Sequence, residues 1–253
     1  MGYTTKNGER ENFDIVFDKL YYIIEEQGED LTLHTNTEIQ KIPFGKFLRD
    51  FIYAQLSAQT NWKIIENNFN AIDRVFLSFD KDRIKEHGGE YFDNELKKIR
   101  CGSRVRKAQM IVLNKNIQTL ENVEKEWKGI GNYIIKNPIN EVIRSFSEYN
   151  GKYKLKQMAV ALVCEWLKAY VDLIKPDIHV KRILGMERLG LLNGKETDYQ
   201  VIEKIKNLNS KYSLREIDNM LWEYCREGGK FEICSSNPKC NKCKISSYCN
   251  KKL

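Results

Sequence analysis

Four cysteines near the end of the chain constrain its fold more than any other feature. Within sixteen residues the sequence carries Cys234, Cys240, Cys243 and Cys249, spaced C-x5-C-x2-C-x5-C. The first twelve residues contain no apolar segment of the kind that directs secretion, so disulfide bonds are not the expected use of these thiols. Four thiolates in a short loop converge on a soft metal centre, either a zinc ion or an iron–sulfur cluster. The spacing therefore predicts a C-terminal loop tied by a metal.

The periodicity of apolar residues elsewhere is typical of helices. Residues 13–26, 44–56 and 64–77 show helical spacing. A longer stripe, with one predicted buried face, consists of Leu155, Met158, Ala159, Leu162, Val163 and Trp166. Sustained alternation of apolar and polar residues is not found, and Pro138 and Pro176 are expected to mark helix boundaries. These patterns predict an all-α fold.

Length and composition exclude several broad classes. A chain of 253 residues with 42% hydrophobic and 30% charged residues fits one large or two small globular domains rather than a disordered protein. The longest unbroken apolar stretch, from Met158 to Cys164, is seven residues, which is too short to span a membrane. We therefore expect a soluble protein of the cytoplasm, associated with the nucleoid if the source is prokaryotic, and no membrane partner.

Positive charge is clustered. The chain has 42 basic and 35 acidic residues, a net charge of +7. Between residues 97 and 107 there are six basic side chains and no acidic one: Lys97, Lys98, Arg100, Arg104, Arg106 and Lys107. From Ile233 to the end there are five lysines and no acid. Such clusters indicate a polyanionic partner such as nucleic acid, although a run of charge is also typical of a merely solvated face.

Few residues are candidates for chemistry. Because the chain has only three histidines, we do not expect a histidine-rich zinc hydrolase site or a Ser–His–Asp site. The sequence also contains no phosphate-binding G-x-x-x-x-G-K-[ST] loop. Asp177, directly after Pro176, is placed to cap a helix and would be held ionised there. A fixed carboxylate also stabilises a cationic sugar when a glycosidic bond breaks, and the two roles are compatible.

Glycine turns offer a second kind of site. Gly129-Ile130-Gly131 and Gly151 lie where short turns between helices are expected. Such a turn exposes backbone N–H groups that bind a phosphate, or else simply ends a helix.

Several segments together resemble one protein family. Leu56-Ser57-Ala58-Gln59-Thr60 is similar to the L-S-A-Q-[AT] segment of the endonuclease III family, the iron–sulfur branch of the helix-hairpin-helix DNA glycosylases. Residues 103–111 resemble its Y-N-S-K-A-E-N-I stretch, with Lys107-Ala108 matching the K-A pair. Residues 177–182 resemble its V-D-T-H-[IV]-x-R segment, in which the aspartate is catalytic. The four cysteines follow in the expected place.

The sequence departs from the family pattern at two places. The first cysteine interval is one residue shorter than the usual six, and we expect a 4Fe-4S cluster there, with zinc as the alternative.

The second departure is in the hairpin, which in the family reads L-P-G-[IV]-G-x-K-x-A. Gly129-Ile130-Gly131 looks most like it but lies 46 residues before Asp177, counting from Gly131. The turn at Gly151 fits the family distance better and is preferred, although its second glycine is missing and its interval to Ala159 is two residues longer.

That difference leaves the position of the family's nucleophilic lysine open. Counting forward from Gly151 reaches Leu155, and counting back from Ala159 reaches Gln157, with Lys156 between them. A lysine there would attack the sugar as an amine and lead to strand cleavage. A glutamine would leave water as the nucleophile and give a glycosylase without lyase activity.

The resemblance implies a monomer of two helical lobes with double-stranded DNA in a cleft between them. One lobe is residues 1–40 with 170–253, including the cluster loop 234–249, and the other is residues 41–169 with the helix-hairpin-helix. A damaged or mismatched base is flipped out of the duplex and removed by hydrolysis of its N-glycosidic bond. The implied catalytic residues are Asp177 and Lys156, and the implied DNA contacts are Gln59, Arg104, Lys107, Gly151 and Lys154.

Some roles stay open at this point. Gln59 would fill the space left by the flipped base, or it is a buried polar residue of a helix. Trp62, Trp127 and Trp166 would stack on that base, or each belongs to the core. The cluster would be structural. The alternative function is a non-catalytic DNA-binding iron–sulfur protein of the same fold, and a zinc-bearing interaction module is a third.

Overall fold

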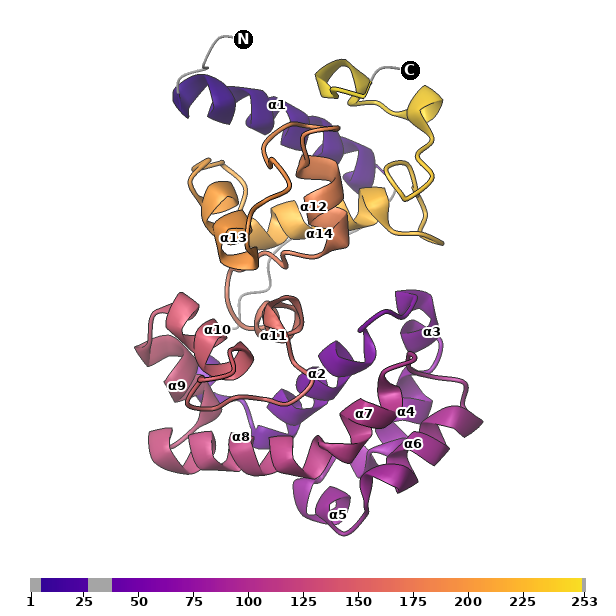
Figure 1. Ribbon diagram of the computed structural model, residues 1–253, viewed down its shortest axis with the longest axis vertical. Coiled ribbons are helices and arrows are strands. Elements are labelled where there is room, and N and C mark those ends of the chain that lie inside the picture. The colour runs from indigo at the N-terminus through magenta and orange to yellow at the C-terminus, as the bar shows by residue number, and fades with distance from the viewer. Residues whose placement is uncertain (1–5, 27–37, 252–253) are drawn as a thin grey trace. The chain divides into compact units, whose positions relative to one another are not determined.

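A computed structural model describes residues 6–26 and 38–251 of the chain, with side chains from residue 12 onward (Figure 1). These residues form fourteen α-helices and four short 3-10 helices, and they contain no β-strand. A single isolated bridge joins Gly185 to Leu192. The predicted all-α class is confirmed. Among the described residues no helix combines the length and apolar character needed to cross a membrane.

Contacts within the chain divide it into two compact units. The discontinuous unit consists of Met1–Thr35 and Val171–Leu253, and the continuous unit is Asn36–Tyr170. Each unit has its own set of buried apolar side chains.

The continuous unit holds most of the helices. Its elements are η1 Ile39–Lys41, α2 Phe44–Leu56, α3 Trp62–Glu66, α4 Phe69–Val75, η2 Leu77–Phe79, α5 Lys81–Lys85, α6 Gly89–Lys98, α7 Arg106–Ile111, α8 Leu113–Trp127, α9 Ile130–Lys136, α10 Ile139–Ser147 and α11 Val160–Leu167. Trp166 of α11 is fully buried and lies edge-on to Phe51 and Phe146, at 5.7 and 5.2 Å between ring centroids. Its indole N–H donates to the Phe47 carbonyl at 3.1 Å. α2 and α11 are thereby fastened together at the centre of this unit.

Helix limits agree with the apolar pattern in some places and not in others. Residues 44–56 form one helix as predicted, and Pro138 lies between α9 and α10. The stretch 64–77 is instead broken between α3 and α4 at Asn67 and Asn68, and the latter side chain bonds to the Ile64 carbonyl at 2.8 Å. Asparagine competes for backbone hydrogen bonds in this way, which ends the first helix.

The predicted helix over residues 155–166 is wrong in its first part, because α11 begins only at Val160. Gln157 has a left-handed φ of 58°, which a right-handed helix cannot contain. The backbone N–H of Leu155 donates to the Phe146 carbonyl at 2.9 Å. Leu155 and Met158 are buried all the same, so their side chains fill the core from a loop.

The discontinuous unit is built from α1 Lys6–Glu25, α12 Ile178–Leu184, α13 Asp198–Lys206 and α14 Leu214–Cys225, with η3 Cys240–Lys242 and η4 Ser246–Tyr248. α14 packs against both α1 and α12. Helices α13 and α14 each start with a capping box, formed by Thr197 with Gln200 and by Ser213 with Glu216. In a capping box two otherwise unpaired N–H groups are satisfied by side chains, so the sequence fixes where these helices start.

Candidate functional site

Asp177 occupies the N-cap of α12, as predicted. Its Oδ1 accepts the backbone N–H groups of His179 and Val180, at 2.8 and 3.2 Å. Its own N–H donates to the Lys175 carbonyl at 2.8 Å, which closes a tight turn around Pro176. The carboxylate is therefore held by two N–H groups of α12 and the Asp177 backbone by Lys175, while the second carboxylate oxygen, Oδ2, takes no part in the cap.

A lysine faces that second oxygen. Lys175 Nζ lies 3.5 Å from Asp177 Oδ2, and the two side chains are 15% and 14% exposed. The Lys175 backbone N–H donates to Oδ1 of the buried Asp218 at 3.0 Å, which anchors the lysine to α14. Lys175 was not predicted as a site residue, although its position one residue before Pro176 and two before Asp177 was the available signal. The ammonium and the carboxylate form one mostly buried pair.

Helix α12 also carries two buried polar groups that have no partner among the described residues: His179 Nδ1 and Arg182 Nη1. Burial lowers the pKa of His179, with Asp177 acting in the opposite direction and Arg182 in the same one. His179 is therefore neutral at physiological pH and is not a source of positive charge beside Asp177.

Three of the four predicted metal-binding cysteines share one cavity. Cys240, Cys243 and Cys249 line a hollow of about 320 Å³ together with Ser246, Ser247 and Lys251. The hollow is formed by the 3-10 turns η3 and η4. The Tyr224 hydroxyl of α14 hydrogen-bonds to Cys243 Sγ at 3.4 Å and accepts the Lys244 N–H at 3.2 Å. The loop is thereby docked on α14.

The fourth cysteine, Cys234, does not line that cavity. Its thiol is buried and accepts a hydrogen bond from Arg188 Nη1 at 2.9 Å. A hydrogen bond with Cys225 lowers the pKa of Cys234 to about 7 against the effect of burial, and Arg188 acts in the same direction. The same contact raises the pKa of Cys225.

The four cysteine thiols are the type of ligand that a four-thiolate metal centre requires. Four cysteines lie in one short loop and three of them surround one hollow, which is the composition that zinc and iron–sulfur clusters prefer. The thiols are not in the positions of a formed centre: over residues 6–26 and 38–251 no three His, Cys, Asp or Glu side chains are arranged to hold a metal ion. Cys234, which is hydrogen-bonded to Arg188 and Cys225, is the thiol that does not line the hollow.

The basic stretch of the continuous unit is partly neutralised by acids that precede it in the sequence. Asp93 of α6 pairs with Lys97 at 2.6 Å and with Arg106 at 2.8 Å, and Glu95 pairs with Lys98 at 2.5 Å. Arg104 and Lys107 are exposed and have no carboxylate partner in the described part of the chain. Of the six predicted cations, these two and Arg100 are available to a polyanion.

Gln59 lies outside any helix. It follows the end of α2, is exposed, and has a left-handed φ of 53°. The alternative that Gln59 is a buried polar residue of a helix is therefore wrong. The buried glutamine of this region is Gln55, four residues earlier, whose carbonyl accepts a bond from Gln109 Nε2 at 2.7 Å.

The two glycine turns differ in construction. Lys128 and Gly129, with φ of 54° and 135°, make the short turn between α8 and α9. The first N–H of α9, at Ile130, is already bound by the Glu124 carboxylate at 2.8 Å. A Cβ on Gly131 would lie 2.2 Å from the Ile39 carbonyl oxygen, so this glycine allows close packing on η1. These glycines act in helix termination and packing.

Gly151 belongs to a longer connection, residues 148–159, between α10 and α11. A Cβ there would lie 2.3 Å from the Ser145 carbonyl oxygen, so only glycine lets the connection fold onto α10. The Lys154 ammonium donates to the carbonyls of Ser147 and Met158, the latter at 2.8 Å, and burial lowers its pKa. Lys154 thus holds this connection in place.

Lys156 lies in the same connection, before α11 begins. The Asn116 side chain binds its backbone on both sides: Lys156 N donates to Asn116 Oδ1 at 2.7 Å, and Asn116 Nδ2 donates to the Lys156 carbonyl at 2.9 Å. Gln157 follows in its left-handed conformation. Lys156 and Asp177 belong to different units.

The three candidate tryptophans have different surroundings. Trp166 is fully buried in the core, so the suggestion that it stacks on a base is wrong. Trp127 is half-buried and its indole N–H donates to the Tyr153 hydroxyl at 3.0 Å. Trp62, at the start of α3, is half-buried and contacts Phe69, with ring centroids 6.2 Å apart.

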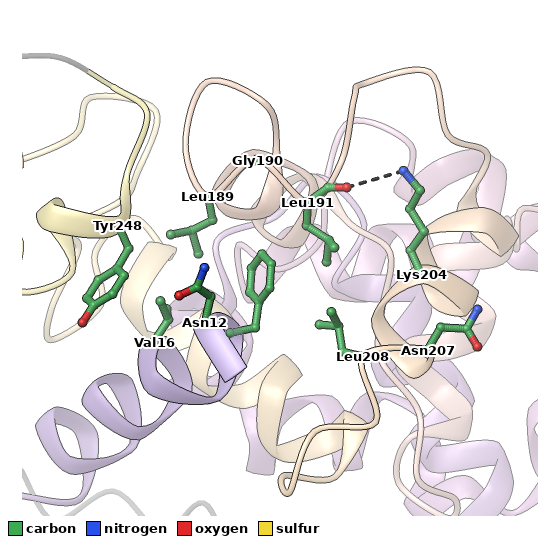
Figure 2. A pocket seen from close by; sticks show the side chains of 10 residues that line it. Asn12, Val16, Leu189, Gly190, Leu191, Lys204, Asn207, Leu208 and Tyr248 are labelled. Atoms are coloured by element: carbon green, nitrogen blue, oxygen red, sulfur yellow. Dashed lines mark hydrogen bonds between the residues drawn. The ribbon is translucent and has the colours of Figure 1, made fainter. Parts of the chain in front are cut away.

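A further cavity in the discontinuous unit, of about 480 Å³, lies between α1, the 189–191 loop, α13 and Tyr248 (Figure 2). Leucine side chains and Phe13 form much of its wall. Lys204 reaches its edge, and its ammonium donates to the Leu191 carbonyl at 3.4 Å (Figure 2). The same ammonium also donates to Glu196 at 2.5 Å. Among the described side chains that line it there is no carboxylate, histidine or thiol.

Comparison with known proteins adds no relative: the sequence matches no model of a known protein family, no curated protein and no solved structure.

Proposed function

We propose that this protein is a base excision repair DNA glycosylase, which hydrolyses the N-glycosidic bond of a damaged or mismatched base in double-stranded DNA. The observation that carries the proposal is the fixed carboxylate of Asp177, with Oδ1 committed to the α12 cap and Oδ2 outside it. Its sequence context, Asp177 to Arg182, is the segment that resembles the catalytic segment of the endonuclease III family.

Asp177 would act by electrostatic stabilisation of the transition state. As the bond to the base breaks, positive charge develops on the deoxyribose, and a nearby fixed anion lowers the energy of that state. Oδ2 of Asp177 would also orient a water molecule for attack on the sugar carbon. A carboxylate already held by two backbone N–H groups needs little reorganisation to do this.

Exposed groups of the continuous unit suit contacts with DNA. Arg104 and Lys107 would bind phosphates, because their charges are not neutralised by a neighbouring acid. Gln59, exposed and held by a left-handed backbone, would enter the space left by the flipped base. Gly151 lets the 148–159 connection fold tightly, and that connection leads into the N-terminus of α11, a suitable place for a phosphate.

The metal centre would be structural. Cys234, Cys240, Cys243 and Cys249 would hold a 4Fe-4S cluster, with zinc as the alternative, and the cluster would supply a rigid crosslink in the basic C-terminal loop. A brown protein with visible absorbance and about four iron atoms per chain is expected for the cluster. A colourless protein with one zinc ion would favour the alternative.

The experiment is incubation with labelled duplexes that carry thymine glycol, methylated adenine, uracil, 8-oxoguanine or an abasic site. Each sample is divided and analysed with and without hot alkali, which cleaves the strand wherever a base has been removed. Strand cleavage after alkali at one of the modified bases is the expected result, and it identifies the substrate. Tight binding with no base release at any of them would contradict the proposal and favour a non-catalytic DNA-binding protein.

A further inference from the structure

A fifth cysteine lies against the four-cysteine loop. Cys225 is the last residue of α14, nine residues before Cys234, and it lies outside the C-x5-C-x2-C-x5-C spacing. Its thiol is hydrogen-bonded to the sulfur of Cys234. Both residues are buried, but Cys234 keeps 7% of its surface exposed and Cys225 keeps none. Two thiols in direct contact are placed for thiol–disulfide chemistry.

The backbone holds these two cysteines together independently of their side chains. The Tyr224 carbonyl accepts the N–H groups of Ile233 and Cys234, both at 3.0 Å. That carbonyl belongs to the peptide bond that leads into Cys225, so the two cysteine backbones lie one hydrogen bond apart. Arg188 Nη1 donates to the Cys234 sulfur at 2.9 Å and fixes its position. A disulfide needs close backbones and converging sulfur atoms, and this junction has both features.

We propose that Cys225 and Cys234 form a redox-active pair, which a peroxide closes to a disulfide in the metal-free protein. In the disulfide, Cys234 has no thiolate to give to a metal, so the disulfide and the metal compete for one sulfur atom. A small thiol reductant opens the bond and restores the ligand. The inference rests on the proposed function in one respect, since it takes Cys234 as a ligand of the proposed metal centre.

The oxidation consumes one peroxide molecule for each pair. Cys234, the thiol that is partly exposed, loses its proton and attacks one oxygen of hydrogen peroxide. The O–O bond breaks, which leaves a sulfenic acid on Cys234 and a hydroxide that takes up a proton to become water. The Cys225 sulfur loses its proton and attacks the sulfenic sulfur. The S–S bond forms as the S–O bond breaks, and a second water leaves, so that two thiols have given two electrons to the peroxide.

The thiols around the 320 Å³ hollow are less suited to pair with Cys234, because Cys234 does not line that hollow. The Tyr224 hydroxyl hydrogen-bonds to the Cys243 sulfur at 3.4 Å. Two adjacent residues at the end of α14 therefore contact different cysteines of the loop. Tyr224 contacts one that lines the hollow, and Cys225 contacts the one that does not.

The test is a disulfide map of the full-length wild-type protein after a chelator has removed its metal. The protein is treated with hydrogen peroxide, alkylated and digested with trypsin. Cleavage after lysine and arginine places Cys225 in the peptide 216–226 and Cys234 in the peptide 231–239, and it places each cysteine of the hollow in a separate peptide. We expect the first two peptides to be joined, with a loss of about two free thiols per chain. Dithiothreitol should reverse both changes.

Zinc uptake tests the competition for the sulfur. Zinc chloride is the probe, because zinc binds thiolates and does not reduce a disulfide. The oxidised protein should bind zinc at least about 10-fold more weakly than the reduced protein. Treatment with dithiothreitol, followed by dialysis to remove it, should restore the affinity.

A variant identifies the thiol that closes the bond. Cys225→Ala should form no disulfide at Cys234 and should leave a sulfenic acid there, which dimedone traps and mass spectrometry detects. Cys164→Ala, a change at a buried cysteine of the continuous unit, is the matched control. It should form the disulfide within about 2-fold of the wild-type rate.

Cys234 recovered as a free thiol after peroxide, or joined to a cysteine of the hollow, would overturn the pairing. A mapped disulfide between Cys225 and Cys234 with unchanged zinc affinity would overturn the competition with the metal. None of these measurements uses DNA. A failure to release any base from the duplex panel would therefore refute the proposed glycosylase and leave the disulfide standing, and a failure of the disulfide map would leave the glycosylase standing.

Discussion

The two units present their candidate groups in opposite ways. In the discontinuous unit, the side chains of Asp177 and Lys175 are mostly buried, and hydrogen bonds hold the backbone on either side of Pro176. In the continuous unit, Gln59, Arg104 and Lys107 are exposed. A reacting group must be fixed because a small displacement is costly in rate, whereas a phosphate contact acts through charge and tolerates movement. Under the proposed function, the discontinuous unit would supply the catalytic group and the continuous unit would supply affinity for DNA.

The largest expected effect is that of Asp177→Asn on base release. Asparagine still accepts the two N–H bonds of the cap, so the fold is retained, but the anion that stabilises the sugar cation is lost. We expect the single-turnover rate to fall by about 1000-fold, and DNA affinity to change by less than about 3-fold. The rate is measured with whichever duplex of the panel releases its base.

Asp80→Asn is the matched control, since Asp80 caps α5 with bonds to the N–H groups of Asp82 and Arg83 at 3.0 and 3.2 Å. It should leave the rate within about 2-fold of wild type. An equal loss of rate in both variants would show that the loss comes from the altered helix cap and not from the missing negative charge at residue 177.

The second effect concerns the metal centre proposed for the discontinuous unit. Cys243→Ser removes one of the three thiols around the 320 Å³ hollow, and we expect metal content to fall below about half and the melting temperature to fall by about 10 °C. Metal analysis and thermal unfolding check this. Cys164→Ala, a buried cysteine of the continuous unit, should keep the full metal content. Full metal content in Cys243→Ser would contradict the assigned ligand set.

The third effect is smaller and depends on pH. Burial alone would raise the pKa of Glu196. Hydrogen bonds from the Asn193 backbone and from Lys204 outweigh this effect and lower that pKa to about 2. This folded value lies below the ordinary 4.5, so the stabilisation is present above pH 4.5 and is lost as the pH falls toward 2. Glu196→Gln should therefore lower the free energy of unfolding by about 2 kcal/mol at pH 7 and by less at pH 3.

Urea unfolding at the two pH values measures that difference. Glu187→Gln, at an exposed position of the same unit, is the control and should change stability by less than about 0.5 kcal/mol at either pH. A loss in Glu196→Gln that is the same at pH 7 and pH 3 would rule out the charge as its cause.

The smallest effect tests the continuous unit. Arg104→Gln with Lys107→Gln removes two exposed charges, so duplex affinity should fall by about 10-fold or less and the salt dependence of binding should lose about two units of slope. Fluorescence anisotropy across a salt series measures both quantities. Lys98→Gln, whose charge is already paired with Glu95, should change the slope less. An unchanged slope in the double variant would place the DNA contacts elsewhere.

Local signals in the sequence predicted part of this structure well. The helix at 44–56 follows from its apolar spacing, and the cap at Asp177 follows from its place after Pro176. Residues 155–159 have the spacing of a helix but form a loop, because Asn116, forty residues earlier, binds the Lys156 backbone. No pattern within the segment itself contains that contact.

The candidate site shows the same limit. The run from Lys97 to Lys107 contains no acid, yet Asp93 on the preceding turn neutralises two of its cations. The hydrogen bond from Arg188 to Cys234 joins residues 46 positions apart, and the spacing of the cysteines gave no sign of it. Features set by residues adjacent in the sequence could be predicted, whereas ion pairs and hydrogen bonds formed by packing could not.

The most direct measurement compares Asp177→Asn with the Arg104→Gln, Lys107→Gln double variant on one duplex, recording the dissociation constant and the single-turnover rate of base release for each. The proposed division of roles predicts that Asp177→Asn loses rate and keeps affinity, while the double variant loses affinity and keeps its rate at saturating protein. If both variants lose the same quantity, or if Asp177→Asn releases the base as fast as the wild-type protein, the division of roles between the two units is wrong.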